Sequence, residues 1–270
     1  MATPSDALHP ANEDPWRWLV LISCFFAKVF AQGIRKSFGV LLPTLQRQFD
    51  SEIWLLGSIV AIVCAVGDFL ATLDFLHLPI FKEPRFYVII VVSSTVRFTH
   101  MGWVIYLVPN VENKGIAPLY ATLVAAVGGV GDATGKIISG VTLWRELLNS
   151  SALWICGMTI LSISLIMDFM VTSSFKGMLV LGFFQSLGMG MSLSLNNVVL
   201  KDIFGTERLV NVMGWIRFFS GMARVLGGFV VGWIYSSSGY YSYGFVTLGC
   251  VQGLGMLVLV IGRKCIPDTE

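Results

Sequence analysis

Long apolar segments recur along almost the whole chain, and they limit what it can fold into. A helix that crosses the hydrocarbon core of a bilayer needs about 20 mostly apolar residues. Strands of a transmembrane barrel need only about 10, in an alternating pattern that is absent here. Eight segments meet the helical requirement: 18–42, 53–73, 86–108, 117–143, 153–171, 177–200, 210–235 and 241–262. We therefore predict an all-α, polytopic membrane protein with about eight transmembrane helices.

The composition supports a lipid environment and excludes several partners. Only 13% of the 270 residues are charged, whereas soluble domains have about a quarter. The formal net charge is +2 and no basic run occurs, so we predict no nucleic-acid partner. The cysteines form no CxxC pair, and we interpret all of them as small, buried apolar residues: Cys24, Cys64, Cys156, Cys250 and Cys265.

The N-terminal 15 residues and the flanking charges predict the orientation in the membrane. This segment has no Lys or Arg, so it does not resemble the basic start of a secretory signal peptide. We expect the first apolar segment to be retained as a signal anchor. Basic residues near span ends favour the cytoplasmic side. Eight lie on the side of the N-terminus (Arg17, Lys82, Arg85, Arg145, Lys201, Arg208, Arg263, Lys264) and three on the other (Arg47, Lys114, Lys176). We therefore predict that both termini are cytoplasmic.

Ionisable residues within the predicted spans are the strongest functional signal. Each costs at least about 2.5–3.5 kcal/mol at the bilayer centre, so it is tolerated where it faces protein or a wet cavity. The set is Lys28, Arg35, Lys36, Arg97, His100, Asp132, Lys136, Asp168, Arg217 and Arg224. Basic residues outnumber acidic ones, which indicates a cavity that attracts anions. Structural ion pairs between helices are the alternative.

Asp132 and Lys136 are four residues apart, so they lie on one helix face. Such a pair can exchange a proton when a negatively charged solute arrives, and a static ion pair is an equal alternative. Lys36 either faces a solute or extends to the membrane interface. Arg217 and Arg224 are two turns apart, and an arginine there binds a carboxylate or pairs with Asp132 or Asp168.

Small and amide residues predict how the helices pack. Three GxxxG patterns, which start at Gly131, Gly228 and Gly249, favour close helix contacts within the chain over dimerisation. Asn196 and Asn197 are expected to form hydrogen bonds between helices. The chain has no HExxH, GxSxG or P-loop motif and only three histidines. We therefore predict that it is not an enzyme, with no catalytic residue, metal site or cofactor.

Two motifs resemble those of the monocarboxylate transporters, a family of the major facilitator superfamily. Asp14, Trp16 and Trp18 match that family's entry signature, and Arg35-Lys36-Ser37 resembles its Lys-Ser segment in the first helix. Asp132-Ala-Thr-Gly-Lys136 resembles its Asp-x-x-x-Arg pair in the eighth helix, with lysine in place of arginine. Residues 202–208 and 214–239 are similar to its tenth and eleventh helices with their linker.

This resemblance implies proton-linked symport of a small carboxylate, such as lactate or pyruvate, across the plasma membrane. Lys36, Lys136 and Arg224 would bind the substrate and Asp132 would carry the proton. It also implies a possible single-span immunoglobulin-type glycoprotein as an ancillary partner.

The resemblance also implies a shortened chain. Residues up to about 67 are similar to the family's helices one and two, and residues from about 73 are similar to its helices seven to twelve. Alternative splicing or a faulty gene model, with a junction at Gly67–Asp68, would give this result. We expect a cytoplasmic tail at 1–15, two helices of the first half at 16–73, a six-helix second half at 74–262 and a tail at 263–270. Loss of helices three to six would impair transport, so the alternative is a transport-inactive isoform that acts as an interaction or regulatory protein.

Overall fold

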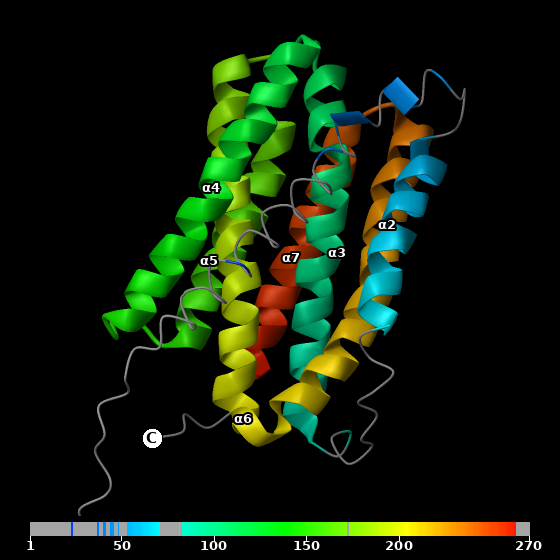
Figure 1. The fold of residues 1–270 in the computed structure, drawn as a ribbon. Helices are drawn as coiled ribbons and strands as arrows, with labels where there is room; N and C mark the ends of the chain where they lie inside the picture. The colour runs from blue at the N-terminus through cyan, green and yellow to red at the C-terminus, as the bar shows by residue number, and fades with distance from the viewer. Residues whose placement is uncertain are drawn as a thin grey trace, which may run out of the picture. The chain divides into compact units, whose positions relative to one another are not determined.

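A computed structural model describes residues 53–70, 83–171 and 173–262, together with Phe81 and single positions before residue 53. The chain divides into two units, Met1–Ser37 and Phe38–Glu270, and every contact given below lies within the second. In the described ranges the secondary structure is helical: α2 (Ile53–Leu70), α3 (Pro84–Asn113), α4 (Pro118–Trp144), α5 (Ser150–Ile166), the 3-10 turn η2 (Met167–Phe169), α6 (Phe175–Ser238) and α7 (Tyr241–Gly262). Figure 1 shows these helices side by side as a bundle.

Local sequence signals set the helix ends. Pro84 and Pro118 occupy the first helical positions of α3 and α4, where a missing N–H group leaves no hydrogen bond unmade. The Ser174 hydroxyl accepts a hydrogen bond from the backbone N–H of Gly177 at 3.3 Å and caps the start of α6. Gly239 ends α6 with a φ of 76°, which glycine adopts without steric cost.

The long helix α6 contains two spans that run in opposite directions. Gly205 has φ 70° and ψ 170°, a conformation that is open almost only to glycine. The chain reverses there, as the yellow part of the ribbon shows in Figure 1. The first segment of α6, residues 175–204, contains the predicted span 177–200, and the second segment, 206–238, contains the predicted span 210–235.

The described helices confirm a multi-pass, all-helical membrane protein. Five of them are long and apolar enough to cross a bilayer, and α6 is long enough to do so twice. The helix α2 has 18 residues and matches the predicted span at 53–73 as far as Leu70. The predicted span at 18–42 lies outside the described residues except for single positions.

The three GxxxG patterns lie at contacts between helices of the same chain, as predicted. Glycine at these positions lets the neighbouring backbone approach closely. On α4, Gly131 and Gly135 meet the backbone carbonyls of Phe183 and Leu187 of α6. On α6, Gly228 and Gly232 meet Ala61 and Trp54 of α2. On α7, Gly249 and Gly253 meet Ser162 of α5. The patterns therefore hold α4, α2 and α7 against the rest of the bundle.

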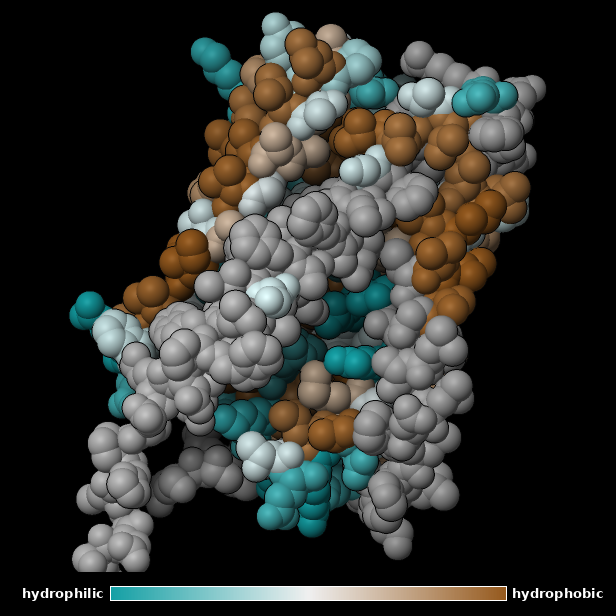
Figure 2. Space-filling view, in the orientation of Figure 1, coloured by the Kyte–Doolittle hydropathy of each residue, from teal (hydrophilic) through white to brown (hydrophobic). Residues whose placement is uncertain are grey.

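The outer faces of the helices are apolar, which corrects the prediction for two cysteines. Figure 2 shows brown, hydrophobic side chains along α4 and α2. Cys156 and Cys250 are free thiols, but they are exposed on this outer surface rather than buried. In a membrane the apolar environment continues outside the protein, so a small apolar side chain gains little from burial in the bundle. Cys24, Cys64 and Cys265 lie outside the residues whose side chains are described.

Candidate functional site

Two polar contacts fix how α3 lies against the first segment of α6. The indole N–H of Trp103 donates to Oε1 of Gln185 at 3.0 Å. Nearer the start of α3, the hydroxyl of Ser93 donates to Oδ1 of Asn196 at 2.7 Å. The helices are therefore antiparallel, and Gly190 lies at about the level of Phe98, halfway along α3. The second contact also confirms the predicted role of Asn196.

Two glycine contacts place charged residues at this same level. Gly190 meets the backbone of Asp132 on α4, and Gly227 meets the backbone of Phe98 on α3. Arg224 is about one helical turn from Gly227, and Lys136 is about one turn from Asp132. We call Arg97, His100, Asp132, Lys136 and Arg224 the mid-depth layer, because all lie near the middle of their helices. Hydrophilic side chains are visible at mid-height between α4 and α2 in Figure 2.

Asp132 and Lys136 form the ion pair that their spacing predicts. The Nζ atom of Lys136 lies 2.8 Å from Oδ2 of Asp132. The Lys136 side chain is 42% exposed and that of Asp132 is 19% exposed. Both remain accessible because α4 packs against α6 through its glycine face, with Gly131 and Gly135 buried. The pair therefore lies beside this contact rather than inside it.

The two arginines of α6 differ in their surroundings. Arg224 is 6% exposed, and it is the largest charged side chain buried within the described bundle. Arg217 shares the same face by spacing but is exposed. Seven residues separate them by about 10 Å along the helix axis, so they lie at different depths. Arg224 thus belongs to the mid-depth layer, whereas Arg217 does not. Lys36, the other predicted substrate residue, lies outside the described residues.

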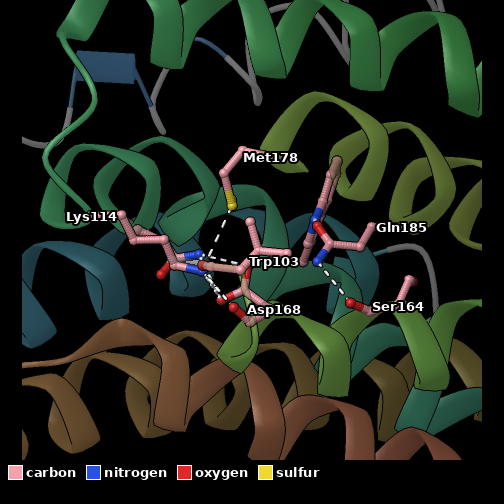
Figure 3. A network of polar contacts seen from close by, with 8 residues as sticks. Trp103, Lys114, Ser164, Asp168, Met178 and Gln185 are labelled. Atoms are coloured by element: carbon pink, nitrogen blue, oxygen red, sulfur yellow. Dashed lines mark hydrogen bonds and ion pairs between the residues drawn. The ribbon is translucent and has the colours of Figure 1, made fainter. Parts of the chain in front are cut away.

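A second ion pair lies at one end of the bundle, and the sequence did not predict it. The Nζ atom of Lys114 lies 2.9 Å from Oδ2 of Asp168, with side chains 8% and 0% exposed. Lys114 also donates to the backbone carbonyls of Asp168 and Val171, at 2.6 and 2.8 Å. The amide of Asn110 donates to both carboxylate oxygens of Asp168, at 3.0 and 3.1 Å. Figure 3 shows Lys114 reaching from α3 to this carboxylate.

This pairing corrects an alternative from the sequence. Among the described residues, the ion-pair partners of Asp132 and Asp168 are Lys136 and Lys114, so neither carboxylate pairs with Arg217 or Arg224. Lys114 lies between the predicted spans 86–108 and 117–143, so the sequence places it in a connection. One signal was available, because α3 and α5 end on the same side of the membrane and each brings one member of the pair there.

A polar chain beside this ion pair joins three helices. Gln185 accepts from Trp103 of α3 and donates its side-chain amide to the carbonyl of Ser164 of α5 at 3.3 Å. Figure 3 shows both contacts next to Lys114 and Asp168. Because Lys114, Asp168 and Gln185 are all engaged in these contacts, this end of the bundle is built for rigidity. Among the described side chains, the mid-depth layer is the better candidate for binding a solute.

Comparisons with known proteins agree with this arrangement. Residues 86–268 match the family model described as Major Facilitator Superfamily. Monocarboxylate transporter 14 of Homo sapiens is 28% identical over 185 residues, which cover 66% of this chain and 33% of the relative. Monocarboxylate transporter 12 of Xenopus laevis is 22% identical over 277 residues, 82% of this chain and 58% of the relative. Monocarboxylate transporter 9 of Gallus gallus is 26% identical over 152 residues, which cover 54% of this chain and 29% of the relative.

These relatives are longer than the chain, which spans about a third to somewhat over half of their length. The family match, in contrast, extends over the consecutive helices from α3 to α7. Long apolar helices, close glycine contacts and charges at mid-depth are all found within the matched residues. The chain therefore belongs to the major facilitator superfamily.

Proposed function

We propose that the chain is a non-enzymatic secondary transporter that carries a small monocarboxylate, such as lactate or pyruvate, together with a proton across the plasma membrane. The observation that carries this proposal is the Asp132–Lys136 ion pair, which is partly exposed in the middle of a spanning helix. Membership of the superfamily and the names of the similar proteins support the same class of solute.

The proposed binding step is an exchange of partners at Lys136. An incoming carboxylate competes with Asp132 for the Lys136 ammonium, while Arg224 adds positive charge at the same depth. Lys36 is proposed as a third cation facing the substrate. A single charge at the bilayer centre costs at least about 2.5–3.5 kcal/mol. When Asp132 accepts a proton as the carboxylate arrives, the added charges cancel and this cost is avoided.

Transport also requires a second repeat on the other side of the solute. Transporters with this fold place the solute between two repeats that rock about it. The family match covers residues 86–268, and by resemblance helices three to six of the first half are missing. We therefore propose that this chain alone transports slowly or not at all, and that a version with these helices restored between Gly67 and Asp68 transports well.

Uptake into proteoliposomes tests this function. Radiolabelled lactate, pyruvate, creatine and carnitine are offered to the chain and to the restored version, at an acidic and at a neutral external pH. We expect the restored version to take up lactate and pyruvate faster at the acidic pH. Failure to move any of the four solutes would overturn the choice of substrate.

The variant Asp132→Asn tests the proton step in the same assay. It removes the carboxylate that accepts the proton but keeps a polar side chain of similar size. We expect uptake to fall and to lose its dependence on external pH. Lys136→Arg is the matched control, because it keeps the positive charge and restores a planar fork. If Asp132→Asn keeps both the rate and the pH dependence, the proton role is wrong.

The second candidate is an interaction or regulatory protein that does not transport. The favouring observation is that the chain spans only about a third of the human relative. Its partners would be an immunoglobulin-type glycoprotein or a complete transporter. Surface biotinylation of the unmodified chain distinguishes the candidates. Retention inside the cell without uptake favours the second, whereas surface delivery with uptake favours the first.

A further inference from the structure

An apolar groove of about 650 Å³ lies between α5 and the first segment of α6. Its open side is formed by Ile163, Met167, Val180 and Phe184, which are each about half exposed. No residue of the mid-depth layer lines it. Since α5 and α6 are both spanning helices, the groove opens sideways to the hydrocarbon of the bilayer. It is therefore distinct from the proposed solute site.

One end of the groove carries a single cation. Lys176, the second residue of α6, lines the groove, and the remaining lining residues are uncharged. Its side chain is exposed, and it forms no ion pair with any described residue. The N–H groups of the first turn of α6 lie beside it, and this end of a helix favours a negative group. The groove thus combines a positive end with an apolar body.

The groove has the length of one bilayer leaflet. Along α6 it runs from Lys176 to Phe184, and on the other side it runs back from Met167 of η2 to Ile160 of α5. Eight residues of helix span about 12 Å. Half of a hydrocarbon core of about 30 Å is about 15 Å. Lys176 lies at the end of its span, where lipid headgroups are found, and Ile160 and Phe184 lie near the bilayer middle.

We propose that this groove binds one anionic phospholipid of the surrounding bilayer. The phosphate lies at the Lys176 ammonium and the first turn of α6, and one acyl chain lies along α5 towards Phe184. A phospholipid fits better than an apolar helix of another protein, because a helix leaves the Lys176 charge without a partner. The Val171 backbone also binds Lys114, so the lipid would lie next to the buried ion pair.

Native mass spectrometry of the purified full chain tests this proposal. Palmitoyl-oleoyl phosphatidylglycerol or phosphatidylcholine is added to the detergent solution, and the bound fraction is measured. We expect the chain to retain phosphatidylglycerol preferentially. Lys176 is the one charged residue in the lining of the groove, so Lys176→Gln should lower this retention about fivefold, which corresponds to about 1 kcal/mol. Lys176→Arg should restore retention.

Two further variants distinguish the contribution of the Lys176 charge to lipid retention from that of the apolar groove. Lys201→Gln is the matched control, because Lys201 is an exposed lysine on the same segment of α6 but does not line the groove. It should leave lipid retention unchanged. Val180→Trp fills the groove from its exposed wall and should reduce retention of both lipids. Thermal unfolding checks that each variant is folded. If Val180→Trp does not fold, the comparison of Lys176→Gln with Lys201→Gln still tests the proposal.

Three outcomes would overturn the proposal. Equal loss of phosphatidylglycerol in Lys176→Gln and Lys201→Gln would show a general effect of surface charge. Full retention in a folded Val180→Trp variant would place the lipid elsewhere. Equal retention of phosphatidylcholine and phosphatidylglycerol by the unmodified chain would show that the site does not select an anionic lipid. None of these measurements depends on transport, so the result is independent of the proposed function.

Discussion

Lys114 and Asp168 lie at one end of a bundle whose interior otherwise contains few charges. The Asp168 carboxylate receives hydrogen bonds from Asn110 and Lys114, and the Lys114 ammonium is shared with two backbone carbonyls. These carbonyls lie at the end of α5 and η2, where a positive charge is favourable. The ion pair therefore joins α3 to the end of α5, and each charge depends on its partner.

Removing one member of this pair should be more harmful than removing both. Lys114→Met leaves a buried carboxylate without its ion partner, and we expect a loss of about 3–5 kcal/mol in stability. The double variant Lys114→Met/Asp168→Leu should recover most of this loss. Thermal unfolding followed by tryptophan fluorescence measures Lys114→Met, Asp168→Leu and the double variant. A single variant as stable as the unmodified chain, or a double variant worse than both singles, would contradict the assignment.

The sequence predicts one of the two ion pairs, and the difference is a matter of separation. Asp132 and Lys136 are one helical turn apart, so helix geometry alone brings them together. Lys114 and Asp168 are 54 residues apart, and their meeting depends on how α3 and α5 end. The sequence likewise does not predict that Arg224 is buried and Arg217 is exposed. Spacing shows which residues share a helix face, but not which helices pack against that face.

At the scale of elements, α4 and the first segment of α6 approach each other backbone to backbone. Gly131 and Gly190 lie at this contact, and a Cβ atom at either would meet the backbone of the other helix. We expect Gly131→Ala and Gly190→Ala each to destabilise the protein by about 1–3 kcal/mol, since backbone cannot move aside as a side chain can. Thermal unfolding in detergent measures the effect.

The same helix offers matched controls for these substitutions. Gly129 and Gly140 of α4 have open space where a Cβ would lie. Alanine there should be neutral or stabilise by up to about 1 kcal/mol, because it restricts the unfolded chain and favours the helix. Equal effects at Gly129 and Gly131 would argue against the close contact between α4 and α6.

The reversal within α6 depends on a single residue. Gly205 has φ 70° and ψ 170°, which lies outside the left-handed region that asparagine tolerates. We expect Gly205→Ala and Gly205→Asn to cost similar amounts, about 1–3 kcal/mol, because neither side chain fits this conformation. Thermal unfolding compares them, with Gly140→Ala as the control. Rescue by asparagine but not alanine would indicate an ordinary left-handed turn instead.

The sequence predicts the spans of α6 well, but not their connection. Apolar runs indicate residues 177–200 and 210–235, and both lie within the observed helix. The polar residues between them, such as Lys201 and Asp202, are also helical up to the turn. Hydropathy reports which residues lie in hydrocarbon, whereas the helix continues until the backbone of Gly205 stops it.

At the scale of the whole molecule, the described unit arranges its residues by environment. Apolar side chains face outwards, glycine lines the helix contacts, and the buried charges of Asp168 and Arg224 lie in an ion pair and in the mid-depth layer, respectively. The error for Cys156 and Cys250 follows from the same arrangement, because in a membrane protein an apolar residue need not be buried. Composition and span length therefore predict the class of fold, while the position of each side chain depends on packing.

The proposed function requires the Asp132–Lys136 pair to face water rather than lipid, and thiol labelling tests this requirement most directly. Lys136→Cys is placed in a chain in which the five native cysteines are replaced by serine. A charged, membrane-impermeant methanethiosulfonate reagent reacts with thiols that water reaches. The control is Ile137→Cys, the next residue along α4, whose side chain is 65% exposed on the apolar outer surface. We expect Lys136→Cys to react rapidly and Ile137→Cys to react only with a lipid-soluble maleimide. Equal protection of both cysteines from the charged reagent would contradict the claim and show that the pair faces lipid.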